Sequence, residues 1–225
     1  MPEISSLTLS ANPVAYYKLE ADGNDETANN NDLTVTGTPT FGAAKFGNGV
    51  TIDADTKHLA KVTGCANLPT GTGNLSIVAW LKRVGTLTAT SAGYIAFGAS
   101  TDGSNLACIT AGSANNTVRL GTFAGGTGSF GSDVAVSTTA TMVGFTRSAT
   151  GVTFKSYLNG ALVATDTVTA RNIGSAVTVR LGESYPGVWN LQFDDAAIFA
   201  AALTDADMAL INGAGPKGLA LLGVG

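Results

Sequence analysis

Carboxylates that could hold a cation are concentrated in one loop near the start of the chain. Residues 20–32, EADGNDETANNND, follow a predicted strand at 14–19 and include Glu20, Asp22 and Asp25. Residues of these types favour turns, because their side chains bond to the local backbone. Carboxylate and carbonyl oxygens are also the ligands that Ca²⁺ prefers. The three carboxylates are therefore candidate calcium ligands.

A fourth carboxylate, Asp195, lies in a strand predicted over residues 191–199, LQFDDAAIF. Strict alternation turns it inward with Phe193 and Ala197. A buried carboxylate needs a partner. The alternatives are an arginine such as Arg147 or Arg180, loop N–H groups, or a structural Ca²⁺ shared with the three loop carboxylates. An internal hydrogen-bond network is at least as well supported as the metal.

Residues for catalysis are not evident. A glycosidase needs two carboxylates that point into one cleft, whereas Asp194 and Asp195 are adjacent and are predicted to face opposite sides of the sheet. His58 is the single histidine, and its neighbours suggest no Ser-His-carboxylate or Cys-His arrangement. We expect a protein that is not an enzyme.

Aromatic side chains offer a second kind of site, since they can stack on sugars. Trp80 lies in an apolar strand and is predicted to be core, whereas Tyr185 and Trp189 lie in or beside a turn, SYPG, and are predicted to be exposed. Tyr157 is predicted on the solvent face of a hairpin, opposite Leu162. Tyr157, Tyr185 and Trp189 are the candidate glycan-binding residues.

Composition restricts the class of protein. The chain has 225 residues, 29 of them glycine, with 12% charged residues and a net charge of −4, which favours an all-β domain and makes nucleic acid an unexpected partner. No apolar run is long enough to cross a bilayer. No signal peptide is recognisable at the start, so we expect synthesis in the cytosol, with Cys65 and Cys108 as free thiols.

The pattern of strands and turns predicts a two-sheet antiparallel sandwich with one short C-terminal helix. Asn159-Gly160 suits a type I′ hairpin turn in which Leu158 pairs with Ala161 and Ser156 with Val163, placing Val163 in the core. Residues 75–83 are predicted to be a central strand, residues 121–131 a flexible loop. Thr204 predicts a helix N-cap, with the helix ending at Gly213. The predicted parts are an arm (1–11), a domain (12–213) and a tail (214–225).

The chain resembles the laminin-G-like jelly rolls of the concanavalin A-like lectin and glucanase superfamily. The resemblance runs from about residue 15 to 213 and rests on ordered segments, among them YYKLE (16–20), FGNGV (46–50), LSIVAWLK (75–82), YLNG (157–160), RLG (180–182) and FDDAAIF (193–199). It implies two packed sheets, one of them concave, and raises the calcium hypothesis. The Trp-His pair that members often carry near residues 141–143 is missing here.

Two functions are expected. The first is a structural role as an accessory or decoration protein on a virion surface, capsid or tail, with other virion subunits or further copies of itself as partners. The second is a carbohydrate-binding module that recognises surface glycans, by analogy of fold. The two are compatible in one adhesion protein.

Overall fold

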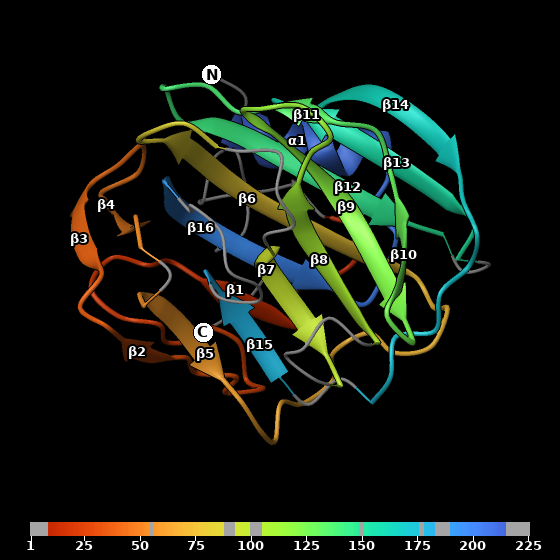
Figure 1. Cartoon of the computed structure of the whole chain (residues 1–225), viewed down its shortest axis with the longest axis horizontal. Helices are drawn as coiled ribbons and strands as arrows, with labels where there is room; N and C mark the ends of the chain where they lie inside the picture. The colour runs from red at the N-terminus through yellow and green to blue at the C-terminus, as the bar shows by residue number, and fades with distance from the viewer. Residues whose placement is uncertain are drawn as a thin grey trace.

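Two antiparallel sheets pack face to face in this computed structural model, which describes residues 9–54, 56–87, 93–99, 105–148, 151–175, 178–182 and 190–214 (Figure 1). The predicted all-β sandwich with one short C-terminal helix is confirmed. The boundaries at 12 and 213 stay predictions. No helix in the described ranges is long and apolar enough to span a membrane.

The first sheet is centred on two long strands, β6 and β16. Its order is β14 (Ala161–Thr167), β13 (Thr153–Leu158), β12 (Thr141–Arg147), β6 (Leu75–Arg83), β16 (Leu191–Phe199), β4 (Asn48–Ile52) and β3 (Thr40–Ala43), with β1 (Ala15–Tyr17) also paired to β16. The central position predicted for residues 75–83 is confirmed. Every residue of β16 is buried, because both faces of this sheet are covered.

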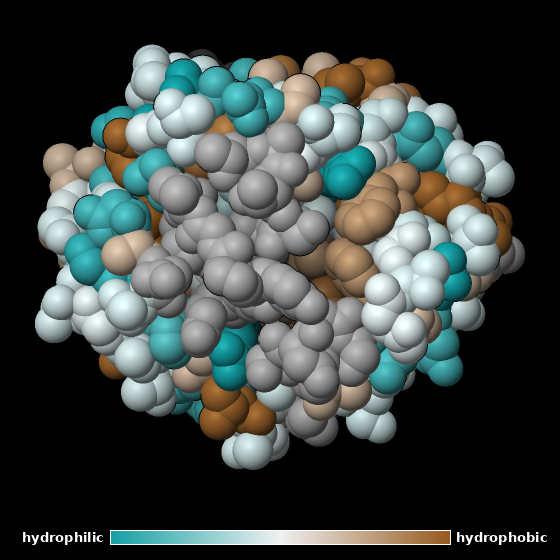
Figure 2. Space-filling view, viewed as in Figure 1, coloured by the Kyte–Doolittle hydropathy of each residue, from teal (hydrophilic) through white to brown (hydrophobic). Residues whose placement is uncertain are grey.

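The second sheet lies in front of the first in Figure 1. Its order is β10 (Thr127–Phe130), β9 (Thr117–Ala124), β8 (Leu106–Ala111), β7 (Gly93–Gly98), β15 (Thr178–Leu181), β5 (His58–Lys61) and β2 (Thr34–Thr36), with β11 (Val134–Ala135) paired to β9. The flexible loop predicted for residues 121–131 is wrong, since β9 and β10 form a hairpin there, turning at Gly125 and Gly126. Seen from this side, apolar residues form separate patches among polar ones (Figure 2).

Alternation along the strands builds two apolar layers. Ile77, Ala79 and Leu81 of β6 enter the core between the sheets, while Val78 and Trp80 point out of the other face of the first sheet. There they join a second group, here called the outer cluster: Leu9, Tyr16, Val78, Trp80, Met142, Tyr157, Ala197, Phe199, Leu203, Met208 and Ile211. Trp80 is fully buried, as predicted.

Helix α1 (Asp205–Ala214) covers the outer cluster and lies behind both sheets in Figure 1. The predicted N-cap is confirmed, because the Thr204 Oγ1 accepts the Asp207 N–H at 3.1 Å and Asp207 Oδ2 accepts the Thr204 N–H at 2.8 Å. Asp207 also accepts hydrogen bonds from the N–H and hydroxyl of Ser10. The helix and the start of the described chain are therefore joined.

The hairpin turn forms as predicted but its register shifts. Asn159 and Gly160 both have positive φ, 50° and 78°, and Leu158 pairs with Ala161. Ser156 then pairs with Ala164 rather than Val163, because a bulge leaves Val163 unpaired. Val163 is 51% exposed, so its predicted place in the core is wrong.

The two cysteines are free thiols, as expected. Cys108 is buried and Cys65 is half-buried, and neither forms a disulfide.

Candidate functional site

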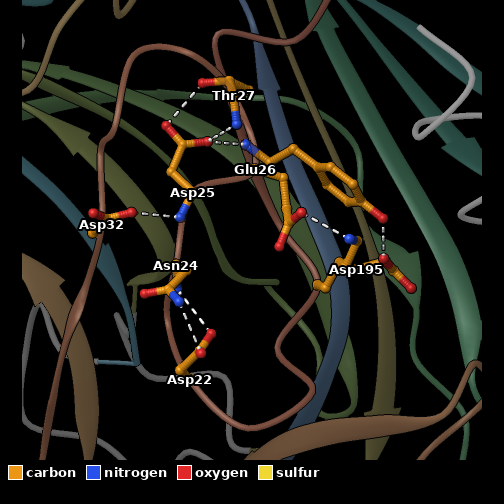
Figure 3. Close-up of polar contacts among 9 residues, drawn as sticks. Asp22, Asn24, Asp25, Glu26, Thr27, Asp32 and Asp195 are labelled. Carbon is orange, nitrogen blue, oxygen red and sulfur yellow. Dashed lines mark hydrogen bonds and ion pairs between the residues drawn. The ribbon is translucent and has the colours of Figure 1, made fainter. Parts of the chain in front are cut away.

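Asp25, a predicted calcium ligand, instead organises the backbone of its own loop. Its Oδ1 accepts the N–H of Thr27 at 3.0 Å and its Oδ2 accepts the hydroxyl of Thr27 at 2.9 Å (Figure 3). Oδ1 also accepts the N–H of Tyr16 at 3.0 Å, and Oδ2 that of Asn31 at 2.8 Å. These four bonds occupy the lone pairs that a cation would need. Asp25 thus fastens the loop to β1.

The other two loop carboxylates also serve turns. Asp22 accepts the N–H and the side-chain amide of Asn24, at 3.1 and 2.9 Å (Figure 3). Glu20 accepts the N–H of Asn48 at 2.8 Å and closes over the β3–β4 turn, where a Cβ on Gly47 would lie 2.3 Å from its Oε1. Each carboxylate therefore has a local structural task.

Asp195 lies in a β-bulge, and beyond it the side chains of β16 point to the opposite faces from those that strict alternation predicts. Asp194 is the cross-strand partner of Trp80 and Ala196 that of Ala79, so Asp195 is the extra residue, with a φ of 47°. Phe193 consequently packs in the core between the sheets, whereas Ala197 packs in the outer cluster. The simple alternation predicted for this strand is wrong, because the bulge moves the pattern by one residue.

The bulge brings Asp194 and Asp195 to the same face, which corrects the prediction that they face opposite sides. Asp194 lies opposite Trp80, and Asp195 Oδ1 accepts the hydroxyl of Tyr16 at 2.5 Å; Trp80 and Tyr16 both belong to the outer cluster. Asp194 Oδ2 accepts the N–H of Phe46 at 2.9 Å. Both residues are only 2% exposed.

Burial favours the protonated, uncharged form of Asp194 and Asp195. Desolvation, opposed by the hydrogen bond from Tyr16 and reinforced by the nearby Asp194 charge, raises the pKa of Asp195 to about 8. Desolvation also raises the pKa of Asp194. Asp195 is therefore largely protonated at neutral pH and can exist buried without a cation.

Arg147 is not the partner of Asp195, although the sequence suggested it. Its guanidinium is fully buried and donates to the backbone carbonyls of Gly71, Gly73 and Arg171, at 2.7 to 3.1 Å. Of the alternatives for Asp195, the internal hydrogen-bond network is the one that the structure contains.

The four predicted calcium ligands do not fit a calcium site in this arrangement. Across the described ranges, no three Asp, Glu, His or Cys side chains form a group that could hold a metal ion. Calcium binding stays a prediction.

The structure describes one of the three aromatic residues predicted to bind glycans, Tyr157. Tyr157 is fully buried in the outer cluster, so the prediction that its ring is exposed is wrong. The sequence predicts helix α1, but it does not predict that the helix packs over Tyr157. Tyr185 and Trp189 lie outside the described residues.

A polar groove lies where the outer face of β12 and β13 meets the segment leading into α1. Its volume is about 490 Å³, within the range of small-ligand sites. Its lining combines hydroxyl groups, one cation and one carboxylate with three small or aliphatic residues: Thr146, Ser148, Thr153, Lys155, Thr204 and Asp205, with Ala202, Leu203 and Ala206. This is the candidate functional site.

One ion pair gives the groove its polar centre. Lys155 Nζ donates to Asp205 Oδ1 at 2.8 Å, and the Tyr157 hydroxyl donates to the same oxygen at 2.7 Å. The side chains of Lys155 and Asp205 are 34% and 54% exposed. The hydrogen bond from Lys155, followed by that from Tyr157, lowers the pKa of Asp205, so its carboxylate is charged at neutral pH.

The groove was missed from the sequence, although two signals existed. The strand alternation that places Tyr157 on the face opposite the core also places Thr153 and Lys155 there, and Thr204 is predicted as the N-cap. Nothing in the sequence brings these segments together, because their proximity depends on where α1 docks. Tyr157, proposed as a stacking platform, contributes its hydroxyl group to this site instead of its ring.

Solved structures with this fold include several binding domains. Domain 4 of AbnA, a GH43 extracellular arabinanase from Geobacillus stearothermophilus, in complex with arabinotriose, matches with 18% identity and a TM-score of 0.70, over 88% of this chain and 97% of that one. The binding domain of Paraclostridial Mosquitocidal Protein 1 matches with 12% identity and a TM-score of 0.72, over 89% of this chain and 52% of that one.

A third match comes from a structure describing ganglioside-dependent cell entry. Botulinum neurotoxin type C, whose entry depends on interaction with two ganglioside molecules, matches with 13% identity and a TM-score of 0.69, over 91% of this chain and 51% of that one. The chain thus spans about half the length of the toxin domains. At these identities the likeness shows the fold. No curated protein sequence matches this chain.

The sequence itself places the chain in a family. The family described as the concanavalin A-like lectin/glucanases superfamily matches residues 53–209, which is more than half of the chain and includes every residue lining the groove. The protein is therefore a lectin-like jelly-roll domain of the concanavalin A-like lectin/glucanases superfamily.

Proposed function

We propose that this chain is a carbohydrate-binding domain and that the groove between β12, β13 and the start of α1 is its glycan site. The observation that carries the proposal is the lining of the groove: hydroxyl groups around an exposed ammonium and an exposed carboxylate. Sugars present alternating donors and acceptors, which such a set can satisfy. The arabinotriose complex of domain 4 of AbnA adds support by analogy of fold.

The proposal includes no catalysis. Asp194 and Asp195 form a close carboxyl pair, and both are buried under the outer cluster, where a glycosidic bond cannot reach them. In the groove, Asp205 is paired with a lysine, and a retaining or inverting hydrolase needs a second carboxyl group. Release of reducing sugar from any glycan that binds would contradict this part.

A glycan array, followed by calorimetry with arabinotriose and the best array ligands, tests the proposal. We expect binding with a Kd in the range of about 10 μM to 1 mM, equivalent to about −4 to −7 kcal/mol. Substituting Thr153→Trp should fill the groove and abolish binding, while Thr36→Trp on the exposed strand β2 of the second sheet serves as the control. Unchanged glycan binding by Thr153→Trp would show that the glycan site lies outside the groove.

A role on a virion surface, with self-association or assembly among virion subunits, remains the second prediction. It rests on the sequence argument alone. Its test is incorporation into particles after removal of residues 1–11 and 214–225, together with sedimentation of the purified chain. Unchanged incorporation and a monomeric chain would count against it.

A further inference from the structure

The ion pair in the groove leaves hydrogen-bonding capacity unused. Asp205 Oδ1 accepts both Lys155 Nζ and the Tyr157 hydroxyl, and no described residue donates a hydrogen bond to Oδ2. Lys155 has three N–H donors, of which one bonds to Asp205. The groove therefore presents donors and a charged acceptor side by side.

This arrangement matches two hydroxyl groups on neighbouring sugar carbons. Lys155 Nζ lies 2.8 Å from Oδ1 of the Asp205 carboxylate, and Oδ2 belongs to the same group, so the ammonium and the oxygen without a donor are close enough to meet oxygens on adjacent carbons. One hydroxyl can donate to the carboxylate while the next accepts from the ammonium. Both bonds are charge-assisted and stronger than bonds between neutral groups.

The fixed position of Asp205 makes the match selective. The buried Tyr157 hydroxyl holds its Oδ1, and the residue begins α1, where the helix dipole favours a carboxylate. The carboxylate therefore needs no rotation to meet a ligand, so less entropy is lost on binding.

The charge of the groove disfavours acidic sugars. The charges of the ammonium and the carboxylate cancel, Asp207 lies buried in the first turn of α1, and the whole chain carries a net charge of −4. A uronate would have to separate Lys155 from Asp205 and would be repelled by the carboxylate that remains.

We infer that the groove selects neutral sugars with a free vicinal diol, and that Lys155 and Asp205 determine this specificity. The inference rests on the proposed function and narrows its ligand class. It also predicts that the two residues act as a unit, so that loss of either removes most of the selectivity.

Calorimetry with neutral and acidic probes tests the inference. The neutral probes are arabinotriose and β-1,4-mannohexaose. The acidic probe is the β-1,4-mannuronate hexamer, which keeps the ring hydroxyls of mannan and adds carboxylates. The variants are Lys155→Met and Asp205→Asn. The matched control is Lys57→Met, which breaks an exposed ion pair of the same kind, Lys57 to Asp53 at 2.7 Å, outside the groove.

We expect at least one neutral probe to bind, with an affinity at least about tenfold higher than that of the mannuronate. Each groove variant should lower the affinity for the neutral probe by about tenfold or more, whereas Lys57→Met should leave it unchanged. The inference would be overturned if the mannuronate bound as tightly as the neutral probes or more tightly, or if the affinity for the neutral probes were the same in both groove variants as in the wild type. Either result would leave the proposed glycan binding intact. Failure of every glycan on the array would remove the proposed function as well. Melting temperatures within a few degrees of the wild type show that the variants are folded.

Discussion

Two tyrosine–aspartate hydrogen bonds on the same face of the first sheet have opposite consequences. The Tyr16 hydroxyl donates to Asp195 at 2.5 Å and the Tyr157 hydroxyl donates to Asp205 at 2.7 Å. Asp195 is 2% exposed and desolvation raises its pKa to about 8. The Asp205 side chain is 54% exposed, has a lysine partner, and has a lowered pKa.

Solvent access, rather than residue type, separates the structural carboxyl group from the one that can bind a ligand. Asp195 is largely protonated and buried, and its hydrogen bond with Tyr16 joins β16 to β1. Asp205 is charged, lines the groove, and retains an oxygen, Oδ2, to which no described residue donates. Acidic residues in a sequence therefore indicate a site only once their surroundings are known.

The largest effect should come from pH. The pKa of Asp195 is raised in the folded state, so the folded chain holds a proton that the unfolded chain has released, and stability falls as pH rises from about 4 to about 8. The slope is at most about 1.4 kcal/mol per pH unit for this one group. Aspartates whose pKa is lowered in the fold, such as Asp205 and Asp207, lose their contribution only at acid pH, so a window of about pH 5 to 8 isolates Asp195 and Asp194.

Urea unfolding across that window provides the measurement, and Asp195→Asn is the control. Asparagine mimics the protonated acid and tolerates the positive φ at this position, so the variant should lose much of the pH dependence and be more stable than the wild type at pH 8. A wild-type stability that rises steadily to pH 8 would contradict a neutral Asp195.

Paired Tyr→Phe substitutions should show the next largest effect. Tyr16→Phe leaves the buried Asp195 without its donor and should cost about 2–3 kcal/mol, whereas Tyr157→Phe should cost about 1 kcal/mol because Asp205 keeps Lys155 and water. Chemical denaturation of both variants at pH 6 checks this. Equal costs would mean that the two hydrogen bonds do not differ as their burial suggests.

Removing the charge of Lys155 should have a smaller effect on stability. Lys155→Met breaks a partly exposed ion pair, and such pairs contribute about 0–1 kcal/mol. Thermal unfolding should therefore place this variant within a few degrees of the wild type, close to the control Lys57→Met. A larger loss would show that the pair supports the docking of α1 and does more than serve the groove.

Calcium removal should have the smallest effect. The carboxylates of Asp25 and Asp195 are occupied by internal donors, so EDTA should shift the melting temperature by less than about 1 °C, equivalent to a few tenths of a kcal/mol. Restoring calcium provides the control. A clear rise in melting temperature with calcium, absent with magnesium, would show that a site forms from these residues after rearrangement.

Strands and turns with strong local signals could be predicted from the sequence. The bounds of β6 and β16 match the predictions, and Asn159-Gly160 forms the expected turn, because Asn and Gly accept positive φ there. The burial of Asp195 was also predicted, although its partner was not.

Bulges and docking could not be predicted, for physical reasons. Both faces of β16 are covered, so apolar residues such as Ala196 and Ala197 follow one another and the period of two that would reveal the register is lost. The extra residue at Val163 leaves no local signal either. The groove joins Thr146, Ser148, Thr153 and Lys155 to residues 202–206, and their contact depends on the position of α1 against the hairpin.

The joining of Ser10 to Asp207 has a consequence for how the chain acquires its structure. The two residues are 197 positions apart, and β1 likewise pairs with β16, so the layer over the first sheet closes through contacts of very high sequence separation. Chains dominated by such contacts fold slowly. A nascent chain would expose Trp80 and Phe199 until α1 has been synthesised, and in that interval the protein is most open to aggregation or to capture by a chaperone.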